Sequence, residues 1–200
     1  MKPLLTILTP GYAHQGNGDT YVASPTCSLL QYNDKNYIID PACNPELLLS
    51  ALTKHSLATN DIHAIFLTHY HLDHLLNIRL FPHTPLYDGS MKWDSDNETP
   101  YTDYWLTPEF KVLHTPGHAS EQYSLLVDTE NYGLVCIAQD VFWWEDGKQR
   151  SDTVSDLLDL VDPFAANTTE LRASRQLVLE SGATWIIPGH GTIFKNPYNG

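Results

Sequence analysis

The stretch "FLTHYHLDHLLN", residues 66–77, places three histidines and one aspartate within six positions, directly after a short apolar run. His69 and His71 are two residues apart at the predicted end of a strand, where an extended backbone points alternate side chains to one side. Asp73 and His74 follow where the chain is predicted to turn into a helix, so they can face the same cavity. Imidazole and carboxylate ligands suit zinc, iron or manganese better than calcium or magnesium. The stretch therefore predicts a transition-metal site.

Three further residues of ligand type occur downstream, each directly after an apolar segment. His118 follows "VLHTPG", Asp140 ends "GLVCIAQD" and His190 follows "WIIPG". Sheets of mixed α and β proteins usually place their ligands at the carboxyl ends of strands. The repetition of this arrangement indicates that these side chains join the histidine cluster in one site.

Four motifs in this order, "THYHLDH", "TPGH", "AQD" and "PGHG", resemble those of the metallo-β-lactamase-fold hydrolases. The resemblance implies an α+β fold, the αββα four-layer sandwich, with two metal ions in the groove between its sheets. It assigns three ligands to each ion and one that bridges both: His69, His71 and His118; Asp73, His74 and His190; and Asp140. By the same resemblance Asp40, which closes "NYIID", orients the ligand loop from behind without binding metal.

Shorter matches resemble a narrower group, metallo-β-lactamase-domain-containing protein 1 and its single-domain relatives. These matches are "LFP" after the histidine motif, "DVF" at the bridging position and "SR" ahead of "IIPGHGTIF". An RNA-cleaving activity has been assigned to an animal member of this group, which makes RNA endonuclease the alternative function. At two positions where many family members have glycine, this chain has Ala42 and Gln139. These departures concern the substrate rather than the metal ligands.

We predict a single domain over residues 1–200, built from two halves of similar size and without an added C-terminal domain. The apolar patterns predict strands at residues 4–8, 26–32, 36–40, 61–69, 85–87, 111–115, 123–128, 133–138 and 184–188. Helices are predicted at residues 45–57, 73–79 and 168–181. Two segments, residues 10–21 and 88–109, are predicted to be irregular loops.

The composition limits the partners. The chain is acidic, with 11 Lys and Arg against 24 Asp and Glu, and its basic residues form no stripe. This disfavours a nucleic-acid partner. The sequence has no apolar run of the roughly 18 residues that a membrane helix needs, and its start does not resemble a signal peptide. We therefore expect a cytoplasmic protein with a small-molecule substrate and no membrane partner.

The predicted activity is metal-dependent hydrolysis. Two divalent ions that share one water can hold it as hydroxide near neutral pH and polarise the bond that it attacks. We expect zinc, with iron or manganese as the other candidates, because the ligand types suit all three. Asp73 is the predicted catalytic residue. The predicted substrate contains a small ester, thioester, lactone or related bond, which the metal-bound hydroxide attacks. A non-catalytic metal-binding module is disfavoured, because structural zinc sites are closed by four protein ligands.

The substrate pocket is predicted from aromatic residues and one histidine: His14, Trp93, Tyr104, Trp105, Phe142 and Trp143. Three of them lie in the 88–109 loop, which is long enough for a lid or a pocket wall. Two directly follow Asp140, and the histidine belongs to a Gly-rich loop that can overhang the site. The alternative is that the aromatic side chains pack in the core. Exposed aromatics in the 88–109 loop would also suit a homodimer.

Overall fold

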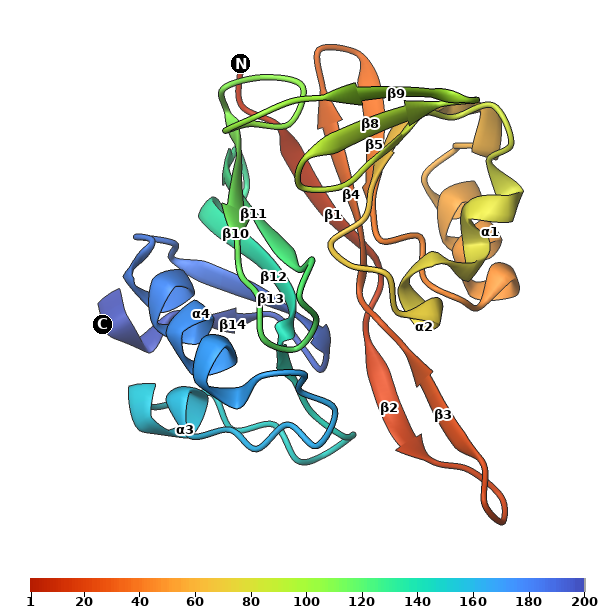
Figure 1. The fold of residues 1–200 in the computed structure, drawn as a ribbon. Coiled ribbons are helices and arrows are strands. Elements are labelled where there is room, and N and C mark those ends of the chain that lie inside the picture. Colours follow the sequence, from red (N-terminus) through yellow and green to blue (C-terminus); the bar gives the residue numbers. More distant parts are fainter. Residues whose placement is uncertain (200) are drawn as a thin grey trace.

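Two β-sheets lie face to face in the computed structural model, which describes residues 1–199 (Figure 1). The N-terminal sheet has seven strands, in spatial order β1 (Leu4–Thr9), β4 (Cys27–Tyr32), β5 (Lys35–Ile39), β6 (Ile62–Phe66), β7 (Leu86–Tyr87), β8 (Met91–Asp94) and β9 (Asn97–Pro100). The C-terminal sheet has five strands, in spatial order β10 (Phe110–His114), β11 (Tyr123–Thr129), β12 (Gly133–Trp143), β13 (Trp185–His190) and β14 (Phe194–Lys195). Each sheet thus comes from one half of the chain.

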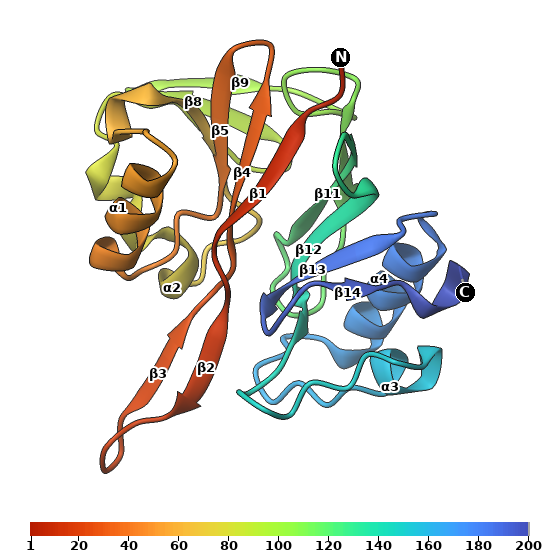
Figure 2. The same cartoon turned by 180° about the vertical axis from the view of Figure 1, so that it is seen from behind.

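Helices cover the outer faces of both sheets (Figures 1 and 2). On the N-terminal sheet these are α1 (Pro45–Lys54), α2 (Leu72–Leu75) and the 3-10 turns Thr59–Asp61 and Leu76–Leu80. On the C-terminal sheet they are α3 (Val154–Leu158) and α4 (Thr168–Glu180), and a 3-10 turn at Pro197–Asn199 follows the last strand. Across residues 1–199, no helix combines the length and apolar character needed to cross a membrane.

The alternation of side chains along the strands builds the layers. In β12, Val135 and Ile137 point into the core between the two sheets, whereas Cys136 and Ala138 point the other way and pack against α4. The same period-two pattern in the central strands of the N-terminal sheet divides them between the central core and α1. Strands buried on both faces read as continuous apolar runs, as they do here. The predicted αββα sandwich is confirmed.

A two-stranded ribbon projects beyond both sheets (Figure 2). It consists of β2 (Tyr12–Gln15) and β3 (Tyr21–Ser24), and we call residues 12–24 the arm. The prediction of an irregular loop over residues 10–21 was wrong, because β2 is only four residues long and its sequence, YAHQ, has no apolar run that would reveal a strand. A remote segment holds the arm: Ala13 N donates to Asp146 Oδ1 (3.1 Å), and Asp146 N donates to Ala13 O (2.8 Å).

The prediction for residues 88–109 also needs correction. Strands β8 and β9 form a hairpin there, closed by a turn in which Ser95 has a φ of 58°. Every residue of β9 is exposed, so the alternation that reveals a half-buried strand is missing. The remainder of the segment is irregular and passes over the core, into which Trp105 inserts completely.

The site lies at one end of the parallel strand pairs. β5 runs parallel to β6, and β12 runs parallel to β13. Asp40, Ala42 and Gln139 follow or interrupt these strands with φ values of 47°, 62° and 49°. This left-handed conformation costs a residue with a side chain roughly 1–2 kcal/mol. The two positions at which the sequence lacks an expected glycine are thus positions where the backbone favours one.

Candidate metal centre

The loop after β6 presents four ligand-type side chains in succession. The chain stays extended as far as His71, which is the N-terminal cap of α2 with φ −67° and ψ 139°. The helix then starts, and His74 N donates to His71 O (3.0 Å) in its first turn. The change from extended to helical backbone turns Asp73 and His74 towards the cavity that His69 and His71 already face.

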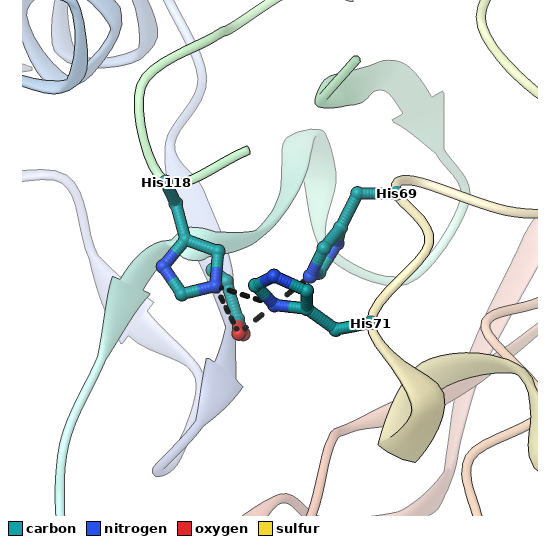
Figure 3. A group of neighbouring side chains, drawn as sticks. His69, His71 and His118 are labelled. Carbon is teal, nitrogen blue, oxygen red and sulfur yellow. Dashed lines mark hydrogen bonds and ion pairs between the residues drawn. The ribbon is translucent and has the colours of Figure 1, made fainter. Parts of the chain in front are cut away.

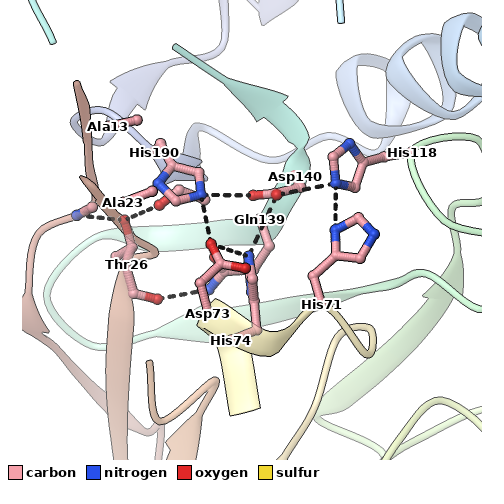
Figure 4. Close-up of polar contacts among 12 residues, drawn as sticks. Ala13, Ala23, Thr26, His71, Asp73, His74, His118, Gln139, Asp140 and His190 are labelled. Carbon is pink, nitrogen blue, oxygen red and sulfur yellow. Dashed lines mark hydrogen bonds and ion pairs between the residues drawn. The ribbon is translucent and has the colours of Figure 1, made fainter. Parts of the chain in front are cut away.

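All seven predicted ligands come together, and the ligand atoms within each group lie within 4.8 Å of one another (Figures 3 and 4). Two groups hold all seven: His69, His71, His118 and Asp140, and Asp73, His74 and His190; a third group combines Asp40 with His69 and His74. Within the first, His118 Nε2 is 2.9 Å from His71 Nδ1; within the second, His190 Nε2 is 3.3 Å from Asp73 Oδ2. The N-terminal sheet supplies one side of each of the first two groups and the C-terminal sheet the other.

Asp140 lies between the two groups (Figure 4). Its Oδ2 is 3.2 Å from His118 Nε2 and 3.4 Å from His74 Nε2, while its Oδ1 is 3.8 Å from His190 Nε2. Residue 189 on the neighbouring strand must be glycine, because a Cβ on Gly189 would lie 1.7 Å from Asp140 Oδ1. The glycine of the "PGHG" motif therefore makes room for the carboxylate that joins the two groups.

The donor set fits divalent metal ions. His69 Nε2, His74 Nε2 and Asp140 Oδ1 are among several buried side-chain atoms of the described residues that have no hydrogen-bond partner. Buried polar atoms are normally paired, so each such atom needs an explanation. These three belong to the groups described above, and their lone pairs converge as those of metal ligands do. The residues present therefore fit a pair of ions.

Two of the histidines, His74 and His190, make a second contact on the side of the ring that faces away from the centre. Asp40 Oδ2 accepts from His74 Nδ1 (2.8 Å), and Asp40 also accepts from Thr68 N (2.8 Å) and Thr68 Oγ1 (2.6 Å). His190 Nδ1 lies 2.9 Å from Tyr12 O. A proton on Nδ1 leaves the Nε2 lone pair facing the centre, which fixes the tautomer that a metal requires. Asp40 thus lies where the resemblance placed it.

His118 has a comparable partner that the sequence did not reveal. Its Nδ1 is 2.7 Å from Asp162 Oδ2, and both side chains are buried. Asp162 lies in "DLVDPFAAN", which contains no motif and no regular element. No signal in the sequence points to it, because the contact joins two loops 44 positions apart.

The pKa values of the site residues refer to the site without metal ions. Burial alone would raise the pKa of Asp140, but His74, His190 and His118 outweigh it and hold this pKa well below its usual range. Burial, followed by the neighbouring His74, lowers the pKa of His69. For His118 burial is outweighed by hydrogen bonds to Asp140 and Asp162, which raise its pKa to about 9. Protons thus balance the carboxylates here, and metal binding would displace them.

A family model described as the Metallo-beta-lactamase superfamily matches residues 20–89, which include the histidine loop. The chain carries a metallo-β-lactamase superfamily domain. The Xenopus laevis Metallo-beta-lactamase domain-containing protein 1 is 28% identical over 206 residues, covering 94% of this chain and 80% of that protein. The Homo sapiens protein of the same name is 30% identical over 162 residues, covering 75% of this chain but only 55% of its own length.

Solved structures share the fold of this metallo-β-lactamase domain. A Thermotoga maritima protein of the metallo-β-lactamase type aligns with a TM-score of 0.72 at 20% identity, over 98% of this chain and all of that one. A chemotaxis sensor with a peroxy diiron species aligns with a TM-score of 0.68 at 14% identity, over 99% of this chain and 88% of that one. A dizinc quorum-quenching lactonase in complex with a product aligns with a TM-score of 0.61 at 16% identity, over 86% of this chain and 74% of that one. At these identities the likeness shows the fold alone.

A cavity of about 420 Å³ opens above the ligands of the metallo-β-lactamase domain. Its floor consists of ligands from both groups: His71, Asp73, His118, Asp140 and His190. Its walls are apolar or aromatic: Ala13, Tyr21, Ala23, Trp143 and Phe164. Along the described part of the chain, no lysine or arginine lines this cavity. The site therefore joins a polar floor to apolar walls.

Of the predicted pocket residues, only Trp143 lines this cavity. Phe142 is fully buried on the opposite face of β12, against α4, because neighbouring residues of a strand point to opposite sides. Trp105 is fully buried between the sheets. For both residues the core alternative is the correct one.

Three predicted pocket residues lie outside the cavity. Trp93 is half-buried on β8, Tyr104 lies 43% exposed beside β10, and His14 points outward from the arm to Asp146 (2.9 Å). The expectation that the segment around His14 overhangs the site is nevertheless fulfilled by its neighbour Ala13. Tyr21 and Phe164, which do line the cavity, were missed because each stands in a segment without a motif.

Proposed function

We propose that this domain is a hydrolase that uses two divalent ions to cleave a small ester, thioester or lactone. The observation that carries the proposal is the meeting of two ligand groups at Asp140, on the floor of a cavity whose walls are uncharged. A floor of this kind serves hydrolysis at an electrophilic carbon, and uncharged walls suit a neutral substrate. We expect zinc first, with iron or manganese as the other candidates.

The assignment of ligands follows the two groups. His69, His71 and His118 would hold one ion and Asp73, His74 and His190 the other, with Asp140 shared. When bound, such a pair of ions lowers the pKa of water towards neutrality and polarises the oxygen of the bond under attack. The buried carboxylates of Asp40 and Asp162 would keep two of the imidazoles oriented while this happens.

Asp73 is suited to handle the proton. Burial alone would raise the pKa of Asp73, but the hydrogen bond from His190, followed by the charge of His74, lowers it. The carboxylate is therefore ionised at neutral pH and accepts hydrogen bonds. Its side chain is 30% exposed and borders the cavity, so it can orient an attacking water and take its proton.

The walls favour a carbonyl substrate over a phosphodiester. Proteins that bind RNA neutralise its phosphates with lysine and arginine. The cavity walls offer none, and the chain carries 24 acidic against 11 basic residues. The dizinc quorum-quenching lactonase of the same fold acts on a lactone, which is a carbonyl substrate, and this agrees with the choice. The diiron sensor shows that the fold also accommodates iron.

The test is a panel of a lactone, an aryl ester, a thioester, a phosphodiester and a short single-stranded RNA. Metal-loaded wild type is compared with Asp73→Asn and with Asp96→Asn, a control in the exposed β8–β9 turn. We expect cleavage of a carbonyl substrate that falls roughly 10²- to 10⁴-fold in Asp73→Asn and stays unchanged in the control. If RNA alone were cleaved in an Asp73-dependent way, an endonuclease would replace this proposal. If no substrate were cleaved, a non-catalytic metal module would replace it.

A further inference from the structure

We propose that the cavity binds an uncharged apolar group of the substrate, an alkyl or aryl chain, in a slot between the arm and an aromatic wall. This inference rests on the proposed function and names the class of substrate that the site takes. The aromatic wall consists of Trp143 and Phe164, whose ring centroids are 5.5 Å apart with 36° between the ring planes. The Trp143 ring also lies 6.2 Å from that of His190, so the wall reaches the ligands directly.

The arm forms the opposite side of the slot with one face only. Ala13 and Ala23 are cross-strand partners, as are Gln15 and Tyr21, so these residues share a face. Three of them, the two alanines and Tyr21, line the cavity. Ala13 and Ala23 lie on the His190 side of the ligand cluster (Figure 4). The side chains of the arm next to the ligands are thus small, and the larger Tyr21 lies further along the same face of the arm.

The aromatic residues at the mouth leave apolar surface in contact with water. Phe164 is 61% exposed and Tyr21 is 43% exposed, and both line the cavity. Burial of apolar surface is the main favourable term in binding, so a substrate that covers these rings gains affinity. A charged group in the same place would find no side chain to pair with among the five wall residues. The slot therefore selects for an apolar, uncharged group.

The first measurement uses a series of p-nitrophenyl esters with acyl chains from acetate to octanoate. We expect KM to fall about three- to fourfold for each added methylene until the slot is full, with kcat nearly constant. Phe164→Ala removes an exposed wall ring without disturbing the core, and it should flatten this dependence. Val161→Ala is the control, since Val161 is 82% exposed on the same segment and does not line the cavity. Ala23→Leu, which fills the slot, should favour the short esters.

The second measurement separates this inference from the proposed function. Calorimetry compares the binding of octanoate and acetate, which share a carboxylate and differ only in the apolar chain. We expect octanoate to bind at least about 30-fold more tightly, and Phe164→Ala to remove most of the difference. Equal binding of the two acids would overturn the slot, even if esters were hydrolysed. Tight octanoate binding without any hydrolysis would keep the slot and overturn the proposed function.

An independent observation concerns the ligand His118. We infer that Asp162 is a positioning residue that fixes this imidazole for metal binding. Besides the 2.7 Å contact between Asp162 and His118, two backbone hydrogen bonds join the segment after Asp162 to the loop that carries His118. Ala166 N donates to His118 O (3.2 Å), and Asn167 N donates to Gly117 O (2.8 Å). A Cβ on Gly117 would lie 2.1 Å from Leu171 N in α4, so the loop packs directly on that helix.

A buried arginine holds the other end of this segment. Arg175 is 3% exposed; its Nε donates to Val141 O (3.0 Å) and its Nη1 donates to Leu160 O. Val141 follows the shared ligand Asp140, and Leu160 lies two residues before Asp162. The guanidinium therefore ties the segment with the positioning carboxylate to the strand with the shared ligand. This fixes the geometry of Asp162 relative to the centre.

The test compares Asp162→Asn with Asp159→Asn, a control whose side chain is 65% exposed. Chelator titration should show one of the two ions bound about 10- to 100-fold more weakly in Asp162→Asn, and cobalt-substituted protein should show an altered absorption spectrum. Asp159→Asn should match the wild type in both. Unfolding of the metal-free variants by heat checks the fold independently. Unchanged metal affinity and cobalt spectrum in Asp162→Asn would overturn the assignment.

Discussion

The floor and the walls of the site are built in different ways. The floor is formed by side chains at strand ends, and His74, His118 and His190 each make a second contact that fixes the ring. The walls consist of the arm, an irregular segment and Trp143 at the end of β12, and two of their aromatic residues, Tyr21 and Phe164, are partly exposed. Chemistry requires fixed distances between reacting groups, whereas an apolar slot requires only shape and the absence of charge. The floor therefore rests on the sheets, whereas the exposed part of the walls, Tyr21 and Phe164, rests on a ribbon and a loop.

The comparison predicts that damage to the floor is far more costly than damage to the walls. Asp140→Asn keeps the size of the shared side chain but removes its charge. We expect metal content to fall from about two ions per chain to fewer than about one, and hydrolysis to fall to background. Elemental analysis of the purified variant checks this. Two ions retained in Asp140→Asn would mean that the two groups do not depend on a shared ligand.

The next prediction concerns Asp40, which contacts His74 from behind the floor. Asp40→Asn fits the left-handed backbone at this position, since asparagine tolerates a positive φ. It weakens the bond to His74 and leaves Thr68 with a poorer acceptor. We expect about 3 kcal/mol lower free energy of unfolding and a metal affinity reduced 10- to 100-fold. Chemical denaturation and chelator titration would measure the two. A loss of stability without a loss of metal affinity would separate folding from ligand orientation.

The pH dependence distinguishes the metal-free floor from the loaded one. Without metal, three histidines have raised pKa values, and that of His118 reaches about 9 from an ordinary 6.5. A raised pKa gives stability that is complete below the unfolded value and is lost as the pH rises through the folded one. We therefore expect the metal-free protein to lose thermal stability between about pH 6.5 and 9. With zinc the trend should reverse, because the ligands bind as neutral imidazoles. If thermal stability changed with pH in the same way with and without zinc, the assignment of these histidines as ligands would be contradicted.

The smallest effect is predicted in the arm. His14 contacts Asp146 outside the cavity and both side chains are about half exposed, so His14→Ala should change the free energy of unfolding by less than about 0.5 kcal/mol. Asp146→Ala should perturb the arm more, since Asp146 Oδ1 also accepts from Ala13 N. The KM for a long-chain ester should accordingly rise in Asp146→Ala and stay unchanged in His14→Ala. A rise in both would show that the histidine itself supports the wall.

The floor was predictable because its residues follow apolar strands in the sequence. His69, His118 and His190 could be placed from the runs before them, since a strand end fixes where the next side chain lies. Apart from Trp143, which follows Asp140 on the same strand, the walls were not predictable in this way. Tyr21 lies on the same face of the arm as Ala13 because β2 and β3 pair, and the arm is bonded to a segment more than 130 positions away through Ala13 and Asp146.

The sequence by itself determined the two-sheet sandwich, the ligand types and their order, because side-chain period and ligand chemistry are local properties of the chain. Only the tertiary structure decided which side chains surround those ligands. It placed Asp162 behind His118 and Phe164 opposite the arm, and it buried Phe142 and Trp105 instead. The physical reason is that these positions depend on how separate loops and layers pack, and no local pattern records the contacts between them.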